Sequence, residues 1–359
     1  MNEIKRFNDV CFCDGWFYFS AIEFNGLFRW NNETGKTEFV CFFDDELATQ
    51  ANLHSHVILH EKRMYFIPFS GRGISIYDLN SKKMDFVSMT DIMDSNANIA
   101  VALLKDNKIY LFPYYTRSND FMVFDLESKE ISTWNEMTIK VKKLGLNSFC
   151  DFFGAVLRGN ELLMVIFGTG VVLKYNFEEN NLKKMLFADY RFGNVSLVND
   201  DYYITACDGC IYRLDEDGNL SLELNTESKE RYFFKLCENN DYLYAVPCFG
   251  QHIFMKKNNS EWTCMEHLMP KEFERIQSGE PLIWGHANNG KKLFLFPKTG
   301  NGILSIENDK VSFCHLQMDR EMDGIKNLLI RRSTETRDWS VINENGFITL
   351  KDYLSFIVE

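Results

Sequence analysis

The sequence predicts an all-β protein in which one four-stranded unit repeats along most of its 359 residues. Hydrophobic residues make up 45% of the chain and aromatic residues 15%, a composition that suits pleated, half-buried strands. An apolar strand opening recurs at a nearly constant spacing, and four of the six prolines share one position of the repeat. These observations are taken in order below.

The second strand of each unit opens on a large apolar residue that follows a short polar turn. The markers are Trp16, Met64, Ile109, Leu162, Tyr202, Tyr242, Leu293 and Trp339. Successive markers are 48, 45, 53, 40, 40, 51 and 46 residues apart. A four-stranded unit of that length is the blade of a β-propeller, so the chain is predicted to close into a ring of blades.

The shared proline position is the end of the second strand, where Pro68, Pro113, Pro247 and Pro297 fall. Proline has no N–H to donate to a sheet, so it belongs where pairing stops and the chain leaves the blade. Polar turns such as 31–36, 80–82 and 215–219 then join the third and fourth strands as hairpins.

Seven units are complete, and we expect seven blades, with eight as the alternative. The eighth unit is degenerate, with strands predicted over Lys326 to Arg332 and Trp339 to Asn343. No helix-period stretch longer than about three turns is expected before residue 349. Residues 349–359 carry apolar residues at helical spacing after Thr349 as N-cap, so we expect a short helix that caps a single propeller domain spanning 1–359.

Residues 109–134, which run from Ile-Tyr-Leu-Phe-Pro to Phe-Asp-Leu-Glu-Ser-Lys-Glu-Ile-Ser-Thr-Trp, resemble a blade of the kelch/WD40-like propeller superfamily. The similarity extends as a pattern over nearly the whole chain. The chain has no Gly-Gly doublet, the kelch signature, and no recurring Trp-Asp or Gly-His, the WD40 signatures. The resemblance therefore implies the fold and leaves the function open.

The net charge and the composition limit the classes of partner and the cell compartment that we expect for this chain. A net charge of −12 disfavours binding to nucleic acid, which needs clustered Lys and Arg. No apolar run is long enough for a membrane helix, and no apolar segment follows the N-terminus as in a signal peptide. We therefore expect a cytoplasmic protein without membrane insertion, with ten reduced cysteines and no cofactor.

In a propeller, ligands meet the face that carries the loops between second and third strands and the segments that enter each innermost strand. Arginine and aromatic side chains on one rim suit recognition of an anionic or peptide partner. Arg72 and Arg117 each follow a repeat proline by four residues and are expected to be neighbours, either as a paired cation or as two solvated side chains. The candidate binding residues are His54, His56, Arg72, Arg117, Asp151, Arg191, Arg231, Tyr232, His252, Trp284 and His286.

Two smaller motifs are candidate sites. Cys207 and Cys210 with Cys248 and His252 have the residue types of a tetrahedral zinc site; because the first two flank an ordinary hairpin turn, we expect no metal. His54 and His56 alternate at strand period, so both imidazoles are expected on one face of the strand. We expect a hydrogen-bonded structural pair, with half of a metal or acid/base site as the alternative.

Two functions follow from this sequence. The favoured one is a non-catalytic binding scaffold whose loop-bearing face holds a protein, peptide or glycan partner. The alternative is a propeller hydrolase or lyase that works at the channel mouth with His54, His56, His286, Asp151 and the arginines. An enzyme needs titratable groups that converge in one pocket, whereas a scaffold presents a broader aromatic and arginine surface.

The cysteine interpretation can be tested directly. Thiol titration of the denatured protein, purified anaerobically and without reductant, should recover nearly all ten thiols because a cytoplasmic chain keeps them reduced. Recovery of only half would indicate native disulfides and an exported protein.

Overall fold

The structure is a computed structural model of the chain. It describes residues 7–22, 25–46, 50–93, 97–114, 120–145, 152–227, 232–249, 252–257, 260–265, 283–297, 302–316, 322–336 and 356. Statements about structure below refer to these residues.

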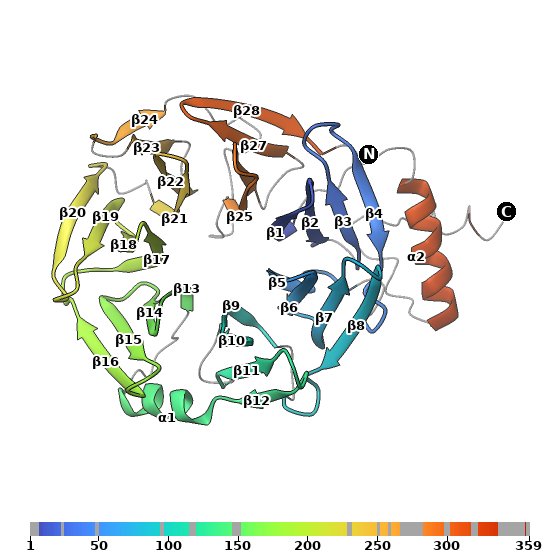
Figure 1. Cartoon of the computed structure of the whole chain (residues 1–359), viewed down its shortest axis with the longest axis horizontal. Coiled ribbons are helices and arrows are strands. Elements are labelled where there is room, and N and C mark those ends of the chain that lie inside the picture. Colours follow the sequence, from blue (N-terminus) through green and yellow to red (C-terminus); the bar gives the residue numbers. More distant parts are fainter. Residues whose placement is uncertain are drawn as a thin grey trace.

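Seven four-stranded antiparallel sheets form a closed ring, so the predicted all-β propeller with seven blades is confirmed (Figure 1). Each blade takes four consecutive strands, the first innermost and the fourth outermost. The strands are β1 (Phe7–Cys13), β2 (Trp16–Ala21), β3 (Leu27–Trp30), β4 (Thr37–Cys41), β5 (His54–His60), β6 (Arg63–Pro68), β7 (Gly73–Asp78), β8 (Lys83–Ser88), β9 (Ile99–Lys105), β10 (Lys108–Pro113), β11 (Met122–Asp125), β12 (Ile131–Thr133), β13 (Phe152–Arg158), β14 (Glu161–Ile166), β15 (Val171–Asn176), β16 (Asn181–Leu186), β17 (Phe192–Val198), β18 (Asp201–Ala206), β19 (Cys210–Leu214), β20 (Leu220–Asn225), β21 (Tyr232–Asn239), β22 (Tyr242–Phe249), β23 (Ile253–Lys257), β24 (Thr263–Met265), β25 (Ile283–Asn288), β26 (Leu293–Pro297), β27 (Gly302–Glu307) and β28 (Lys310–His315).

The repeat read from the sequence matches the blades. Seven of the eight markers lie in the second strands β2, β6, β10, β14, β18, β22 and β26. Pro68, Pro113 and Pro297 end their strands, and Pro247 lies two residues before the end of β22. Each of the four is paired with a residue at the start of the innermost strand, at the rim of the ring.

Every innermost strand contains one extra residue near its start. In β5, for example, His54 pairs with Pro68 and His56 pairs with Ile67, which leaves Ser55 as a bulge. The same irregularity occurs in β1, β9, β13, β17, β21 and β25. A bulge reverses the alternation of side chains on either side of it, so it decides which residues face the neighbouring blade and which face the channel.

The core is divided among the interfaces between blades. One such cluster joins the third and fourth blades, with Phe112, Phe121 and Phe152 each at most 1% exposed. Their ring centroids lie 5.6–6.4 Å apart in edge-on or tilted arrangements. Aromatic pairs in this geometry gain energy beyond the area that they bury, which explains why a ring of short strands uses so many phenylalanines.

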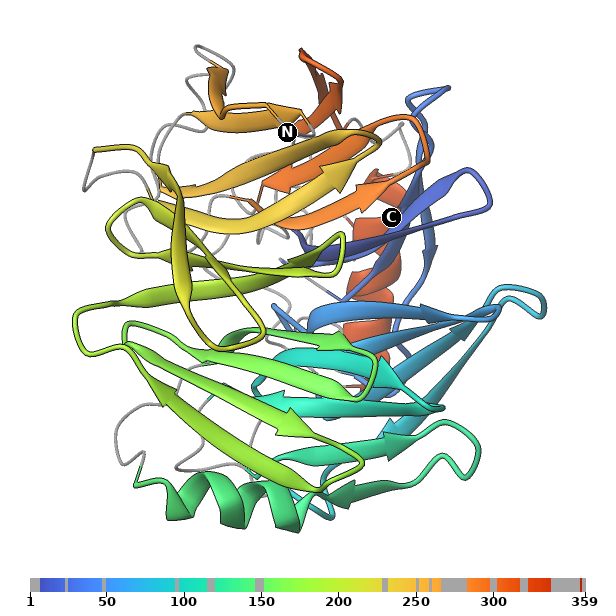
Figure 2. The same cartoon turned by 60° about the vertical axis from the view of Figure 1, so that its left-hand side comes forward.

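The ring closes by packing of side chains between the first and seventh blades. Blade one is complete within β1–β4, so the termini share no blade. Instead the ring centroid of Phe7 lies 5.2 Å from that of Phe296, and those of Phe17 and Phe294 are 4.6 Å apart. Figure 2 shows from the side how the blades stack around the ring.

Two helices accompany the blades. Helix α1 (Asn135–Lys143) follows β12 and buries Met137 and Val141 against the fourth blade. Helix α2 (Met322–Thr336) lies beside β4 on the outside of the ring (Figure 1). Neither helix is long and apolar enough to cross a membrane.

Helix α2 corrects the sequence analysis at one place. Residues 326–332, predicted as a strand of an eighth unit, are helical, and α2 is longer than the three turns expected before residue 349. A short apolar run fits either a strand or one face of a helix, and the tertiary contacts decide. Ile325, Leu329 and Ile330 are at most 2% exposed within the cluster that closes the ring.

The predicted capping helix over 349–359 and the strand over 339–343 lie outside the described residues, apart from Phe356. That phenylalanine packs against the same closing cluster of the first and seventh blades. Chain after the last blade therefore packs on the closing cluster, and α2 supplies most of the described contacts. The cap over 349–359 stays a prediction.

The seal can be tested with two adjacent leucines of α2. Leu329 is 1% exposed and Leu328 is 46% exposed. Leu329→Ala should lower the free energy of unfolding by about 2–5 kcal/mol, the usual cost of a large-to-small change in a core. Leu328→Ala should stay within about 0.5 kcal/mol of the unchanged protein. Urea unfolding would measure both, and equal losses would contradict the packing of α2.

Candidate functional site

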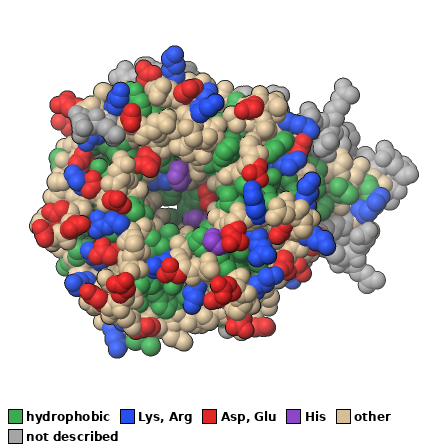
Figure 3. Space-filling view, in the orientation of Figure 1, with side chains coloured by type: hydrophobic (Ala, Val, Ile, Leu, Met, Phe, Trp, Pro, Cys, Tyr) green, Lys and Arg blue, Asp and Glu red, His purple; other side chains and the backbone are tan. Residues whose placement is uncertain are grey.

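A cavity of about 310 Å³ lies at the centre of the ring. All seven innermost strands contribute to its wall. Figure 3 shows the hollow, with histidine and hydrophobic side chains at its edge. Small-molecule sites typically have volumes of about 300–1,000 Å³, and this cavity lies at the lower end of that range. The open mouth also admits the end of a longer ligand.

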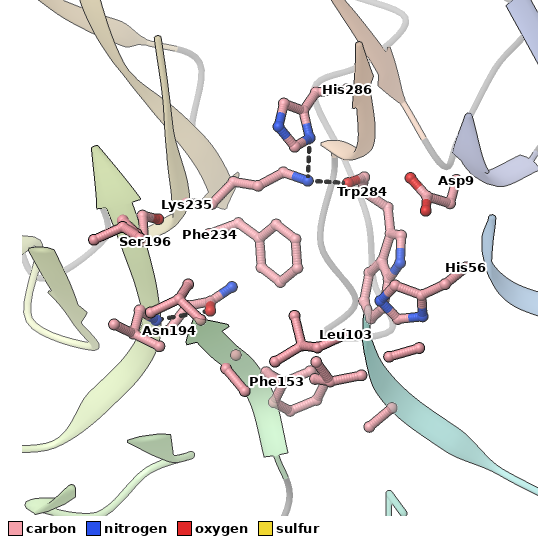
Figure 4. A pocket seen from close by; sticks show the side chains of 18 of the residues that line it. Asp9, His56, Leu103, Phe153, Asn194, Ser196, Phe234, Lys235, Trp284 and His286 are labelled. Carbon is pink, nitrogen blue, oxygen red and sulfur yellow. Dashed lines mark hydrogen bonds between the residues drawn. The ribbon is translucent and has the colours of Figure 1, made fainter. Parts of the chain in front are cut away.

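Aromatic residues occupy the bulge positions of three innermost strands, namely Phe153, Phe234 and Trp284. The rings of Phe234 and Trp284 are stacked, with centroids 5.1 Å apart, and Phe153 meets Trp284 edge-on at 6.2 Å. Figure 4 shows the three rings turned toward the same space. We call these three residues the aromatic mouth. Phe153 and Trp284 are half-buried at the cavity, and Phe234, only 6% exposed, packs against Trp284.

Lys235 reaches from β21 to the next innermost strand, β25. Its Nζ donates hydrogen bonds to the Trp284 backbone oxygen at 2.6 Å and to His286 Nδ1 at 2.8 Å (Figure 4). Because a charged lysine can only donate, the Nδ1 atom of His286 must be an acceptor, and the imidazole is then neutral. The site thus holds one cation and one neutral histidine in direct contact.

Asp9 and His56 come from the first and second blades. Asp9 Oδ2 accepts a hydrogen bond from the backbone N–H of Val57 at 3.0 Å, which ties β1 to β5. The described ion pairs within 4.0 Å do not include Asp9 with Lys235. The cavity therefore holds an anchored negative charge and a positive charge that do not neutralise each other by direct contact.

Asp9, His56, Lys235 and His286 lie among the innermost strands of the ring, and water reaches them from the channel. Burial lowers the pKa of Lys235, although the charges of Cys237 and Asp9 oppose the shift. Burial and the charge of Lys235 hold the pKa of His286 well below its usual range. Burial also lowers the pKa of His56, which the charge of Asp9 partly offsets. Both histidines are accordingly neutral at pH 7.

Other polar residues of the wall are used for structure. Ser196 Oγ accepts a hydrogen bond from the backbone N–H of Leu236 at 3.0 Å, which joins β17 to β21. Asn194 is 5% exposed and packs so close to Gly154 that a Cβ there would come within 1.6 Å of its Oδ1. These groups hold neighbouring innermost strands together and shape the cavity.

Three of the residues predicted from sequence meet in this cavity: His56, Trp284 and His286. Arg191 is exposed where the chain enters β17, and its backbone oxygen accepts from Cys207. His252 is half-buried just before β23. Arg117, Asp151 and Arg231 lie outside the described residues, as does the side chain of Tyr232, so the expected pairing of Arg72 with Arg117 stays a prediction.

His54 lies in the core, and the expectation that it shares a face with His56 is wrong. The bulge at Ser55 makes their partners Pro68 and Ile67, which are successive residues and so face opposite sides. His54 is 4% exposed, Nδ1 is 2.9 Å from Ser20 Oγ, and the ring lies 4.3 Å from that of Phe43. His54 is therefore a structural residue of the interface between blades one and two.

Arg72 covers a buried carboxylate on the loop-bearing face. Glu46 is 2% exposed, and its Oε1 accepts a hydrogen bond from the Arg72 backbone N–H at 2.6 Å. The guanidinium Nε of Arg72 lies 3.5 Å from Glu46 Oε2. Burial raises the pKa of Glu46, and the contacts with Arg72 oppose this shift. Arg72 thus anchors the connection between the first two blades, while half of its side chain stays exposed.

The cysteine motif does not gather into a ligand set in the part that is described. Cys207 Sγ lies 3.8 Å from the Phe192 backbone oxygen, whereas Cys210 Sγ lies 3.7 Å from Asn225 Oδ1. The side chain of Cys248 is outside the described residues. Within the described ranges, no three His, Cys, Asp or Glu side chains are placed to hold a metal ion.

The sequence analysis missed Asp9, Phe153, Phe234 and Lys235. A signal was present for two of them, since Asp9 and Lys235 are charged residues flanked by apolar residues within innermost strands. The two phenylalanines gave no signal, because their place in the cavity wall depends on the bulge, which only the register reveals.

Comparison with known proteins supports the fold. No protein-family model and no curated protein sequence matches the chain. Among solved structures, a streptogramin B lyase is similar over 88% of this chain and 95% of its own, with 8% identity and a TM-score of 0.61. YCF48 from Cyanidioschyzon merolae is similar over 86% of this chain and 98% of its own, with 7% identity and a TM-score of 0.61. A catalytically inactive virginiamycin B lyase from Staphylococcus aureus with quinupristin covers 73% of this chain and 84% of its own, with 13% identity and a TM-score of 0.57. At these identities the likeness shows the propeller fold alone, and the kelch/WD40-like assignment stays a prediction.

The burial of His54 predicts how stability depends on pH. Burial lowers its pKa to about 3 in the folded chain, against 6.5 as its ordinary value. As the pH falls from 7 to 5 the unfolded chain takes up this proton and the folded chain does not, so stability is lost. The His54 contribution to this loss is about 2 kcal/mol.

His54→Gln removes the proton but keeps a polar partner for Ser20. The difference in unfolding free energy between the unchanged protein and this variant should shrink by about 2 kcal/mol from pH 7 to pH 5 in urea titrations. Parallel pH profiles would show that the side chain is protonated in the folded state and not buried as described.

Proposed function

We propose that this propeller is a non-catalytic binding scaffold that holds a protein, peptide or glycan partner on its loop-bearing face. The observation that carries the proposal is the aromatic mouth of Phe153, Phe234 and Trp284 over an open cavity beside Lys235. Aromatic rings and a cation at one opening provide apolar area and an orienting charge, which is the usual composition of a binding hot spot. Stacking on ring faces suits both peptide side chains and sugars.

The net charge of −12 supports a partner other than nucleic acid or an anionic membrane, and we propose a cytoplasmic setting with it. These remain parts of the proposal. The ring itself supplies rigidity, because the residues of the mouth lie on strands that are packed on both faces.

A lyase or hydrolase at the channel mouth is the second candidate. One observation favours it: a neutral histidine, His286, in hydrogen-bond contact with Lys235, whose pKa burial lowers. Two similar propellers are lyases by name. The set expected for catalysis is incomplete, however, because His54 lies in the core and Asp151 is outside the described residues. We therefore favour binding without turnover.

Peptide and glycan arrays probed with the full chain test the scaffold. The double variant Phe153→Ala/Trp284→Ala should weaken array binding at least tenfold, because aromatic anchors carry most of the energy in such sites. Leu186→Ala/Leu222→Ala is the matched control, since both leucines are more than half exposed on outermost strands. Thermal melts of both variants check that the ring is intact.

Binding that survives the mouth variant, or is lost equally in the control, would refute the proposal. Bound ligands recovered from the array should also be chemically unchanged. Cleaved or rearranged ligand would support the lyase or hydrolase in its place.

A further inference from the structure

Lys235 carries a hydrogen-bond donor that no described residue uses. A charged lysine has three N–H donors, and two of them go to the Trp284 backbone oxygen and to His286 Nδ1. Among the described residues no carboxylate lies within 4.0 Å of its Nζ. The third donor is thus left for a group that enters the cavity.

The two existing contacts fix the position of this ammonium. Each joins Lys235 on β21 to β25, so the side chain spans two blades and cannot turn away without losing both bonds. His286 accepts on Nδ1, and its Nε2 points away from Lys235, so the imidazole adds no second donor for a group bound to the ammonium. The free N–H of Lys235 is left as one charge-assisted donor for a carboxylate.

The apolar part of a ligand has a place next to that charge. Lys235 Nζ lies 5.3 Å from the centre of the Phe234 ring, and this ring stacks on Trp284. Phe153 extends the apolar face from the fourth blade (Figure 4). A ligand that places an anion on Lys235 therefore has aromatic surface within reach of its next few atoms.

Asp9 limits the charge that such a ligand can carry. Its carboxylate is held in the same cavity by the Val57 N–H, and its negative charge acts on Lys235. A second negative charge on the ligand would be repelled by Asp9, which lines the same cavity. A dianion such as a phosphate monoester is disfavoured relative to a single carboxylate.

We propose that the channel mouth binds a mono-anionic organic carboxylate, with its carboxylate on Lys235 and an aromatic or branched apolar part against Trp284, Phe234 and Phe153. This inference rests on the proposed binding function and names the chemistry of its ligand. The carboxylate belongs either to a free small acid or to the C-terminus of a peptide.

Calorimetric titration of the full chain with matched probes tests the charge. Phenylpropionate should bind at least about tenfold more tightly than phenylpropionamide, the expected gain from one charge-assisted hydrogen bond. Phenyl phosphate should bind more weakly than phenylpropionate. The peptide Gly-Gly-Phe with a free C-terminus, compared with its C-terminal amide, separates the two sources: the tighter of the two acids identifies the natural one.

Lys235→Met should remove the preference for the acid over the amide, and Lys235→Gln serves as a second variant. Lys257→Met is the matched control, because Lys257 lies exposed on β23 of the same blade and should leave the preference unchanged.

Four results would each overturn the carboxylate site. The unchanged protein could bind acid and amide equally, or bind phenyl phosphate more tightly than phenylpropionate. The preference for the acid could survive both Lys235 variants, or neither acid could bind at millimolar concentration. Array ligands that need the aromatic mouth but ignore Lys235→Met would overturn this inference while leaving the scaffold intact. Array binding that ignores the mouth would refute the scaffold itself.

Discussion

The innermost strand of each blade has one edge that faces the channel, and the rest of the site depends on how the chain satisfies that edge. An unpaired edge exposes backbone N–H and C=O groups in a narrow space. Side chains of the preceding blade bond to several of them: Asp9 accepts from Val57, Ser196 accepts from Leu236, and Lys235 donates to Trp284. These polar side chains of the channel thus hydrogen-bond to the backbone of the next blade. Only the donors and acceptors that remain can bind a ligand.

The bulge near the start of every innermost strand adds the second constraint. It reverses the alternation of side chains at the rim, so one register shift sends His54 into the core and turns His56 toward the channel. In β13, β21 and β25 the bulged residue is a large aromatic ring. The bulge at the rim therefore also places the three residues of the aromatic mouth.

Closure of the ring links this local geometry to stability. Blade one is built wholly from the N-terminal strands, so no shared sheet joins the ends of the chain. Phenylalanines of blades one and seven interlock, and helix α2 buries Ile325, Leu329 and Ile330 over them. At about 1.5–3 kcal/mol for each large buried side chain, this seal is comparable with the net stability of a domain. The channel keeps its shape because the ring cannot open without losing that packing.

The sequence alone determined the all-β class, the blade period, the seven complete units and the proline position, because these depend on local strand, turn and proline chemistry that repeats. It also pointed to Trp284, His286 and His56.

Only the tertiary structure decided the rest. A short apolar run such as 326–332 is compatible with a strand or with a helix, and its packing against the first and seventh blades determines that it is helical. The separation of His54 from His56 and the place of Phe153 and Phe234 in the cavity wall depend on a one-residue shift in register. Reasoning from a strict strand period does not include such a shift. The contact of Lys235 with His286 joins residues 51 positions apart, and the packing of blade six against blade seven brings them together.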